Sequence, residues 1–194
     1  MKFTGFYFSC LLVLFLSCES KKLPVLGSPD HHIRHFAFIN QDGKNITEKN
    51  FEHKIYVADF FFTTCPTICP IMKKQMLRIQ KQFRDNENIL FLSHTIDPDH
   101  DSVSVLKDYA ERIGADTKQW MFVTGSKDEI YKIANEDYNA VVKKDGKTSG
   151  GFAHSGALIL VDKDKKVRGI YDGTKEDQVN QLIKDIPILL NEYN

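Results

Sequence analysis

The sequence has no excess of charge of either sign, few cysteines and only one apolar run of about eleven residues, and these shortages exclude several classes of protein. Its 194 residues hold 26 Lys and Arg against 26 Asp and Glu. A balanced chain has no overall field to bind a phosphate backbone, so we expect no nucleic-acid partner. The apolar run, residues 6–16, is too short to span a bilayer as a mature helix. With 42% hydrophobic residues the chain is not disordered, and at this length one domain can bury a core without disulfide support.

The first residues have the layout of an export signal. Lys2 precedes the apolar run, and small Ser17 precedes Cys18. Residues 15–18 resemble a bacterial lipobox, although Phe15 stands where that pattern usually has Leu. The resemblance implies that Cys18 is lipidated and becomes the first mature residue. The alternative is an ordinary signal peptide cut nearby, which leaves Cys18 incidental.

These features divide the chain into three parts. We predict a lipoprotein signal peptide at residues 1–17, a membrane tether at 18–32 and a domain at 33–194. The tether contains Lys, Pro and Gly without an apolar period. The protein is then exported and membrane-anchored, facing the periplasm or cell exterior, where disulfides persist.

Apolar periodicity predicts strands alternating with helices. Strands are expected at 55–62, 88–96, 120–123, 155–162 and 167–171, with a hairpin around Asp42-Gly43 before them. Helices are expected at 68–83, from Ser102 to Gly114 and after Ser126. Thr174 should open the last helix, which Pro187 should bend or fray. Residues 143–151 read as a polar loop. This order predicts an α/β domain with parallel pairing in its first half.

Candidate chemistry concentrates in Thr63-Thr64-Cys65-Pro66-Thr67-Ile68-Cys69-Pro70, at the end of a predicted strand. Two thiols separated by three residues can form a disulfide or face one metal ion, and a helix start should lower a Cys pKa. A Cys pair at a strand tip leading into a helix is typical of the thioredoxin-like fold. We therefore predict a central mixed sheet flanked by helices, with an N-terminal hairpin.

The two cysteines need a third ligand if they hold a metal. They cannot fill a structural zinc site, which takes four ligands, whereas two thiolates and one imidazole suit three-coordinate copper. Among seven histidines the best placed is His154, just before a late strand and after Gly150-Gly151.

These residues resemble the Sco/SenC family of copper-binding assembly proteins. The resemblance rests on Thr64-Cys65-Pro66-x-x-Cys69-Pro70, on His154 85 residues later, and on residues 40–43, 96–102 and 161–169. It implies a thioredoxin-like fold and copper, as Cu(I) or Cu(II), held by Cys65, Cys69 and His154. The implied partner is apo cytochrome c oxidase subunit II or another copper protein, whose dinuclear copper centre receives the metal or has its thiols reduced. One departure is Ala153, because many relatives carry an acidic residue there.

Plainer interpretations exist for several motifs. Cys65 and Cys69 could form a purely structural disulfide, although so small a loop gains little stability from one. His154 could be a surface residue. The histidines at 31, 32 and 35 could capture copper or merely precede a strand. His94 is expected to be a core or edge residue of its strand. Asp97-x-Asp99-x-Asp101 lacks the Gly and Glu of a calcium loop and reads as a helix-capping turn. Met72 and Met76 read as core.

Two functions from different classes remain. The first is a metallochaperone that holds copper through Cys65, Cys69 and His154 and transfers it. The second is an enzyme, a thiol–disulfide oxidoreductase in which Cys65 attacks and Cys69 resolves as the redox-active pair. The three-residue spacing, and the absence of a proline near His154 in sequence, favour metal handling.

Overall fold

The computed structural model describes residues 21–144 and 152–193, and of Lys144 and residues 152–154 it describes no side chain. Cys18, residues 1–17 and the Gly150-Gly151 approach to His154 lie outside the described residues. The strands are β1 (Ala37–Asn40), β2 (Asn45–Thr47), β3 (Ile55–Phe61), β4 (Ile89–Thr95), β5 (Trp120–Thr124), β6 (Val142–Lys144), β7 (Phe152–His154), β8 (Ala157–Val161) and β9 (Val167–Asp172). The helices are α1 (Ile68–Phe83), α2 (Val103–Ile113), α3 (Lys127–Glu136) and α4 (Glu176–Asn191), with a short 3-10 helix, η1, at Glu48–Phe51.

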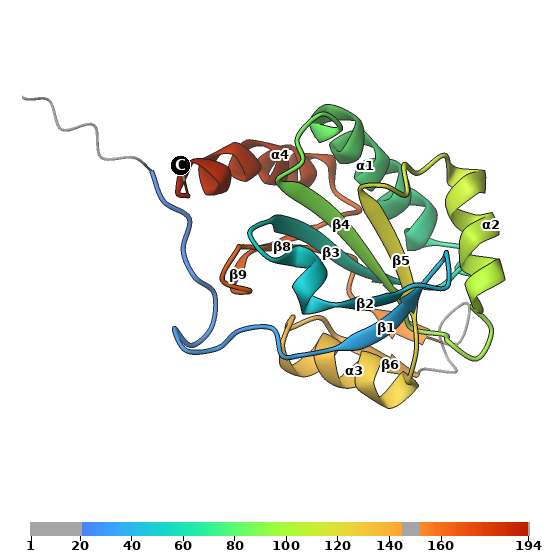
Figure 1. Ribbon diagram of the computed structural model, residues 1–194. Coiled ribbons are helices and arrows are strands. Elements are labelled where there is room, and N and C mark those ends of the chain that lie inside the picture. Colours follow the sequence, from blue (N-terminus) through green and yellow to red (C-terminus); the bar gives the residue numbers. More distant parts are fainter. Residues whose placement is uncertain (1–20, 145–151, 194) are drawn as a thin grey trace, which may run out of the picture.

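Seven strands form one mixed sheet in the order β2-β1-β5-β4-β3-β8-β9 (Figure 1), while β6 and β7 pair separately. The pairs β3–β4 and β4–β5 are parallel, as predicted for the first half of the domain. β3 and β4 are buried along their whole length. Both are apolar runs of the kind that fills the centre of a sheet covered on two faces.

Helices cover both faces of this sheet. α1 and α4 lie side by side on one face (Figure 1). On the same face Tyr109 of α2 contacts Phe61 and Phe122. The other face carries Phe60, which contacts Tyr138 just after α3. Because Phe60 and Phe61 are neighbours in a strand, their side chains point to opposite faces.

Helix α2 begins and ends where the sequence predicts. The Ser102 hydroxyl accepts from the Val105 N–H, and Gly114 closes the helix with a φ of 76°. Only a glycine adopts that left-handed conformation without strain.

Three local predictions differ from the structure. The last helix begins at Glu176, because the Thr174 hydroxyl and N–H donate to the Asp172 side chain. It also runs through Pro187 to Asn191. Buried Ile186 and Leu189 on either side of the proline hold it against the core. The predicted polar loop begins within β6, whose residue Lys144 pairs with Phe152 of β7.

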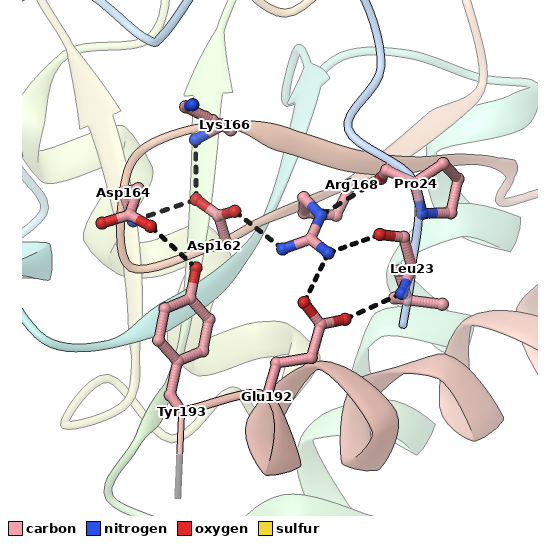
Figure 2. Close-up of polar contacts among 8 residues, drawn as sticks. All are labelled: Leu23, Pro24, Asp162, Asp164, Lys166, Arg168, Glu192 and Tyr193. Carbon is pink, nitrogen blue, oxygen red and sulfur yellow. Dashed lines mark hydrogen bonds and ion pairs between the residues drawn. The ribbon is translucent and has the colours of Figure 1, made fainter. Parts of the chain in front are cut away.

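The segment predicted as a tether is partly attached to the domain. The Leu26 N–H donates to the Val167 carbonyl over 2.8 Å, and the Ile33 N–H donates to the Lys165 carbonyl over 2.8 Å. The Arg168 side chain also holds the segment, because its guanidinium donates to the carbonyls of Leu23 and Pro24 (Figure 2). Residues 23–33 thus run beside β9, the edge strand of the sheet.

A buried ion-pair network completes this attachment. Arg168 contacts Asp162 at 2.9 Å and Glu192 at 2.6 Å, and Glu192 accepts from the Leu23 N–H (Figure 2). We call Leu23, Asp162, Arg168 and Glu192 the N-terminal clasp. It joins the first described residues to the last. No sequence motif predicts this contact. Within the described residues, no helix has the length and apolar content needed to cross a membrane.

Candidate metal centre at the cysteine pair

The two cysteines lie where β3 passes into α1. The Cys65 N–H donates to the Phe62 carbonyl over 3.2 Å, which turns the chain after the strand. Cys69 lies in the first turn of α1 and hydrogen-bonds to the side chain of Cys65. Cys65 is 8% exposed and Cys69 only 1%. The fold therefore brings the predicted pair into contact and leaves Cys65 as the more accessible sulfur.

The pKa of the Cys69 thiol is shifted opposite to the sequence expectation. Its hydrogen bond to Cys65 and its burial both raise this pKa. A backbone hydrogen bond from Phe62 and the positive charge of Lys73 act in the opposite direction. A helix start alone does not decide the pKa here, because desolvation and the shared hydrogen bond favour the protonated form.

Lys73 lies behind the pair in a buried polar network. It is 2% exposed, and its ammonium donates to both Asp59 oxygens at 2.7 and 3.0 Å. The same ammonium donates to the Ser93 hydroxyl over 2.7 Å, and the Trp120 indole N–H donates to that hydroxyl over 2.8 Å. Burial lowers the pKa of Lys73, while the Asp59 carboxylate opposes this shift. We call Asp59, Lys73 and Ser93 the lysine network.

Asp101 fixes the loop that carries Cys65. Its buried carboxylate accepts from the Thr63 N–H at 3.1 Å and from the hydroxyls of Thr63 and Thr95. His100 adds a 2.9 Å contact, and this hydrogen bond raises the pKa of His100. The end of β4 and the loop after β3 are thus joined two residues before Cys65. The Asp97-x-Asp99-x-Asp101 turn also leads into α2, as predicted.

His154, the predicted third ligand, is the last residue of β7 rather than part of a loop. Its backbone pairs with Val142, and the Ser155 N–H donates to the Val141 carbonyl over 2.9 Å. Two residues later, a Cβ placed on Gly156 would lie 3.9 Å from Ile68, the neighbour of Cys69. The chain around His154 thus passes close to the start of α1. Among the side chains described, no three His, Cys, Asp or Glu residues gather into a metal-binding group.

Three other histidines make contacts that explain their positions without a metal. His31 contacts the Asp137 carbonyl at 3.2 Å, and His35 pairs with Glu48 at 2.8 Å. His94 is fully buried among aromatic rings, stacked on Phe60 at 5.0 Å. Its predicted core position is confirmed, as are those of Met72 and Met76.

A family model described as SCO1/SenC matches residues 26–191. The chain belongs to the SCO1/SenC family. A protein described as a SCO1 homologue of Bacillus subtilis is 32% identical over 179 residues, covering 91% of each chain. The family that the cysteine motif and His154 resembled is therefore confirmed.

Solved structures of SCO1/SenC proteins share this fold. A SCO1/SenC family lipoprotein from Bacillus anthracis matches with a TM-score of 0.76 and 31% identity, over 86% of this chain and 99% of the other. BsSco, described as having a disulfide switch and as belonging to the Sco family of cytochrome c oxidase assembly proteins, also matches with a TM-score of 0.76 and 31% identity, over 88% and 98%. Arabidopsis thaliana ScoI with copper bound matches with a TM-score of 0.68 and 25% identity, over 82% and 98%. The predicted thioredoxin-like fold is confirmed.

Sequence reasoning missed two residues that surround the cysteine pair. Lys73 was not predicted to be buried, yet it is paired with Asp59 inside the core. The available signal was Asp59 itself, a carboxylate inside an otherwise apolar strand, which needs a buried cation nearby. Asp101 was assigned only to a turn, and nothing in the sequence pointed to its contact with Thr63.

Proposed function

We propose that this SCO1/SenC protein binds copper as cargo through Cys65, Cys69 and His154 and helps mature the dinuclear copper centre of cytochrome c oxidase. The observation that carries the proposal is the contact between the two cysteine side chains at the start of α1. Two sulfurs already adjacent need little rearrangement to face one soft metal ion. The copper-bound relative with the same fold supports this choice of metal.

Transfer of the cargo needs a coordination shell that another protein can enter. Two thiolates and one imidazole leave such a shell incomplete, so an incoming thiolate can replace one ligand at a time. Cys65 is the more exposed of the pair and suits the first exchange. We assign apo cytochrome c oxidase subunit II or another copper protein as the recipient.

We also propose that residues 1–17 are a lipoprotein signal peptide and that Cys18 carries the lipid anchor. The protein would then face the periplasm or cell exterior. The Bacillus anthracis lipoprotein with the same fold supports this location. Mass spectrometry of the membrane-extracted protein tests it, because an unmodified Cys18 would contradict the proposal.

The copper proposal is tested by anaerobic Cu(I) titration of reduced protein from Lys21 onward, against a chelator of known affinity. We expect one tight equivalent, weakened in Cys65→Ala, Cys69→Ala and His154→Ala. An unchanged Cu(I) affinity in His154→Ala would show that His154 is not a copper ligand. The absence of tight binding would overturn the proposal. His53→Ala is the matched control, because His53 is exposed and lies outside the histidine motifs considered for copper.

A second candidate function is thiol–disulfide exchange by the same pair. The accessible Cys65 beside the buried Cys69 is the arrangement of an attacking and a resolving thiol. The disulfide switch described for BsSco favours the same chemistry. A reduced protein that fails to reduce a peptide disulfide would contradict this second function without touching the first.

A further inference from the structure

A groove of about 340 Å³ opens beside Cys65, between α1 and α2. Its lining combines an apolar floor with positive charge and includes no carboxylate. The lining includes Cys65, Lys74, Leu77, Tyr109, Arg112 and Ile113. Cys69 does not line it, so the groove leads to one sulfur of the pair.

The positive charges of the groove are only partly neutralised. Lys73 is buried against Asp59 and contributes no open charge. Lys74 and Arg112 are exposed, and no ion pair forms to either within the described chain. The Arg112 guanidinium lies 5.2 Å from the centre of the Tyr109 ring, which holds the charge at the groove.

The neighbouring carboxylates lie elsewhere on α2. Asp108 and Glu111 belong to the same helix but do not line the groove. A segment entering the groove therefore meets the charges of Lys74 on α1 and Arg112 on α2. Leu77 and Ile113 offer it apolar contacts. This combination favours an acidic polypeptide that also carries an apolar side chain.

We infer that this groove is the docking site for an acidic, cysteine-bearing segment of the protein's partner. The inference rests on the proposed reactivity of the cysteine pair. Lys74 and Arg112 determine which segment approaches, and Cys65 meets the cysteine that the segment carries. Electrostatic attraction of this kind raises the rate of encounter more than it raises affinity.

The chemistry in the groove balances with the partner's disulfide as oxidant. The Cys65 thiolate attacks one sulfur of that disulfide, forming a mixed disulfide and releasing the partner's other thiolate. Cys69 then gives its proton to the thiolate that the partner has released, attacks the Cys65 sulfur and releases the partner's second thiolate. Two electrons pass to the partner, and Cys65 and Cys69 end as a disulfide.

The test measures the first step with synthetic peptides. Each nine-residue peptide carries one cysteine blocked as a mixed disulfide with thionitrobenzoate, flanked by Glu in one peptide, Lys in the second and Ser in the third. The reduced full chain in detergent is mixed with each, and thionitrobenzoate release is followed, with Cys65→Ser protein giving the background from other thiols. At low ionic strength we expect the Glu peptide to react about tenfold faster than the Lys peptide, and the difference to shrink with added salt.

Charge reversal identifies the groove as the cause. In Lys74→Glu/Arg112→Glu we expect the preference to reverse, with the Ser peptide reacting at nearly the unchanged rate. Lys132→Glu/Lys184→Glu, with the same change of net charge at exposed positions outside the groove, should keep the preference.

Three outcomes would overturn the inference. Equal rates for the Glu and Lys peptides would do so, and so would an equal loss of preference in the two double variants. A chain that fails with the uncharged Ser peptide lacks the exchange chemistry altogether, which overturns the second candidate function as well. The copper titration is independent of all three outcomes.

Discussion

Lys73 and Arg168 are both buried cations held by carboxylates, but they lie at opposite ends of the central sheet. Lys73 lies below the Cys65–Cys69 pair, near the end of β3. Arg168 lies on the edge strand β9, level with the start of β3, because Tyr56 pairs with Val161 and Val161 pairs with Val167. The lysine network stays inside the core, whereas the clasp joins the first and last described residues of the chain (Figure 2).

The difference teaches that similar chemistry serves two purposes in one small domain. Lys73 is close enough to Cys69 for its positive charge to oppose the rise in the pKa of that thiol, so its charge reaches the cysteine pair. Arg168 donates to carbonyls and carboxylates of three separate segments, so its guanidinium fork determines where the N-terminal segment runs. Four substitutions separate these roles, from the largest expected effect to the smallest.

Lys73→Met should have the largest effect. It leaves Asp59 charged, buried and without its cation, which costs about 3–5 kcal/mol of unfolding free energy. Urea unfolding of the reduced protein measures this loss. Asp59→Leu/Lys73→Met should recover most of the stability while still lacking the charge, so Cys69 should stay less reactive than in the parent protein. A double variant as unstable as the single one would contradict this account.

Arg168→Leu should cost less, about 2–3 kcal/mol, for two reasons. Glu192 lies near the surface and can regain water. Asp162 stays buried but keeps its hydrogen bonds from the Asp164 and Lys166 N–H groups. The N–H of Leu26 should lose protection from hydrogen exchange as the segment detaches. Alkylation of Cys65 should stay unchanged, and a change there would show that the two ends are coupled. Arg78→Leu is the control, since its exposed pair with Glu176 should contribute less than about 1 kcal/mol.

His94→Leu tests a buried polar side chain that belongs to neither the lysine network nor the N-terminal clasp. Its ring nitrogens have no hydrogen-bond partner in the described structure, and burial lowers its pKa to about 3. Because the unfolded chain binds this proton near pH 6.5, stability is complete above that pH and is lost as the pH falls towards 3. The parent should lose about 2.5 kcal/mol between pH 7 and 4.5 through this group. The variant should lack that part of the loss, whereas exposed His32→Leu should keep it.

Gly114→Ala should have the smallest effect, about 1 kcal/mol, because its φ of 76° disfavours a side chain. It weakens the end of α2, next to the Cys65 groove, without touching the lysine network. Thermal unfolding should show the loss, while the reaction of Cys65 with an uncharged disulfide should continue at the parent rate. A slowed reaction would mean that general loosening accounts for part of the Lys73→Met effect.

Element positions were largely predictable because the apolar pattern is regular. The strands at β3 and β4, the helix at residues 68–83 and the limits of α2 follow from runs, periodicity and caps. Predictions failed where a local contact competed with the pattern. Asp172 takes the Thr174 hydrogen bonds and delays α4, and core packing on both sides of Pro187 carries that helix onward.

The position of the cysteine pair in the fold was predictable, but the environment of the pair was not. Cysteine spacing and a strand leading into a helix place Cys65 and Cys69 correctly, since both features are local. The sign of the Cys69 pKa shift was not predictable, because burial and the hydrogen bond to Cys65 depend on packing. His154 stays a predicted ligand.

The sequence by itself determined the fold class, the family and the cysteine pair, because each depends on short patterns along the chain. The tertiary structure decided which charges are buried and where they act. Lys73 meets Asp59, Asp101 holds Thr63, and Arg168 joins Leu23 to Glu192 across separations of 14, 38 and 169 residues. Pairings over such distances come from the packing of whole elements, and no local pattern of residue types specifies them.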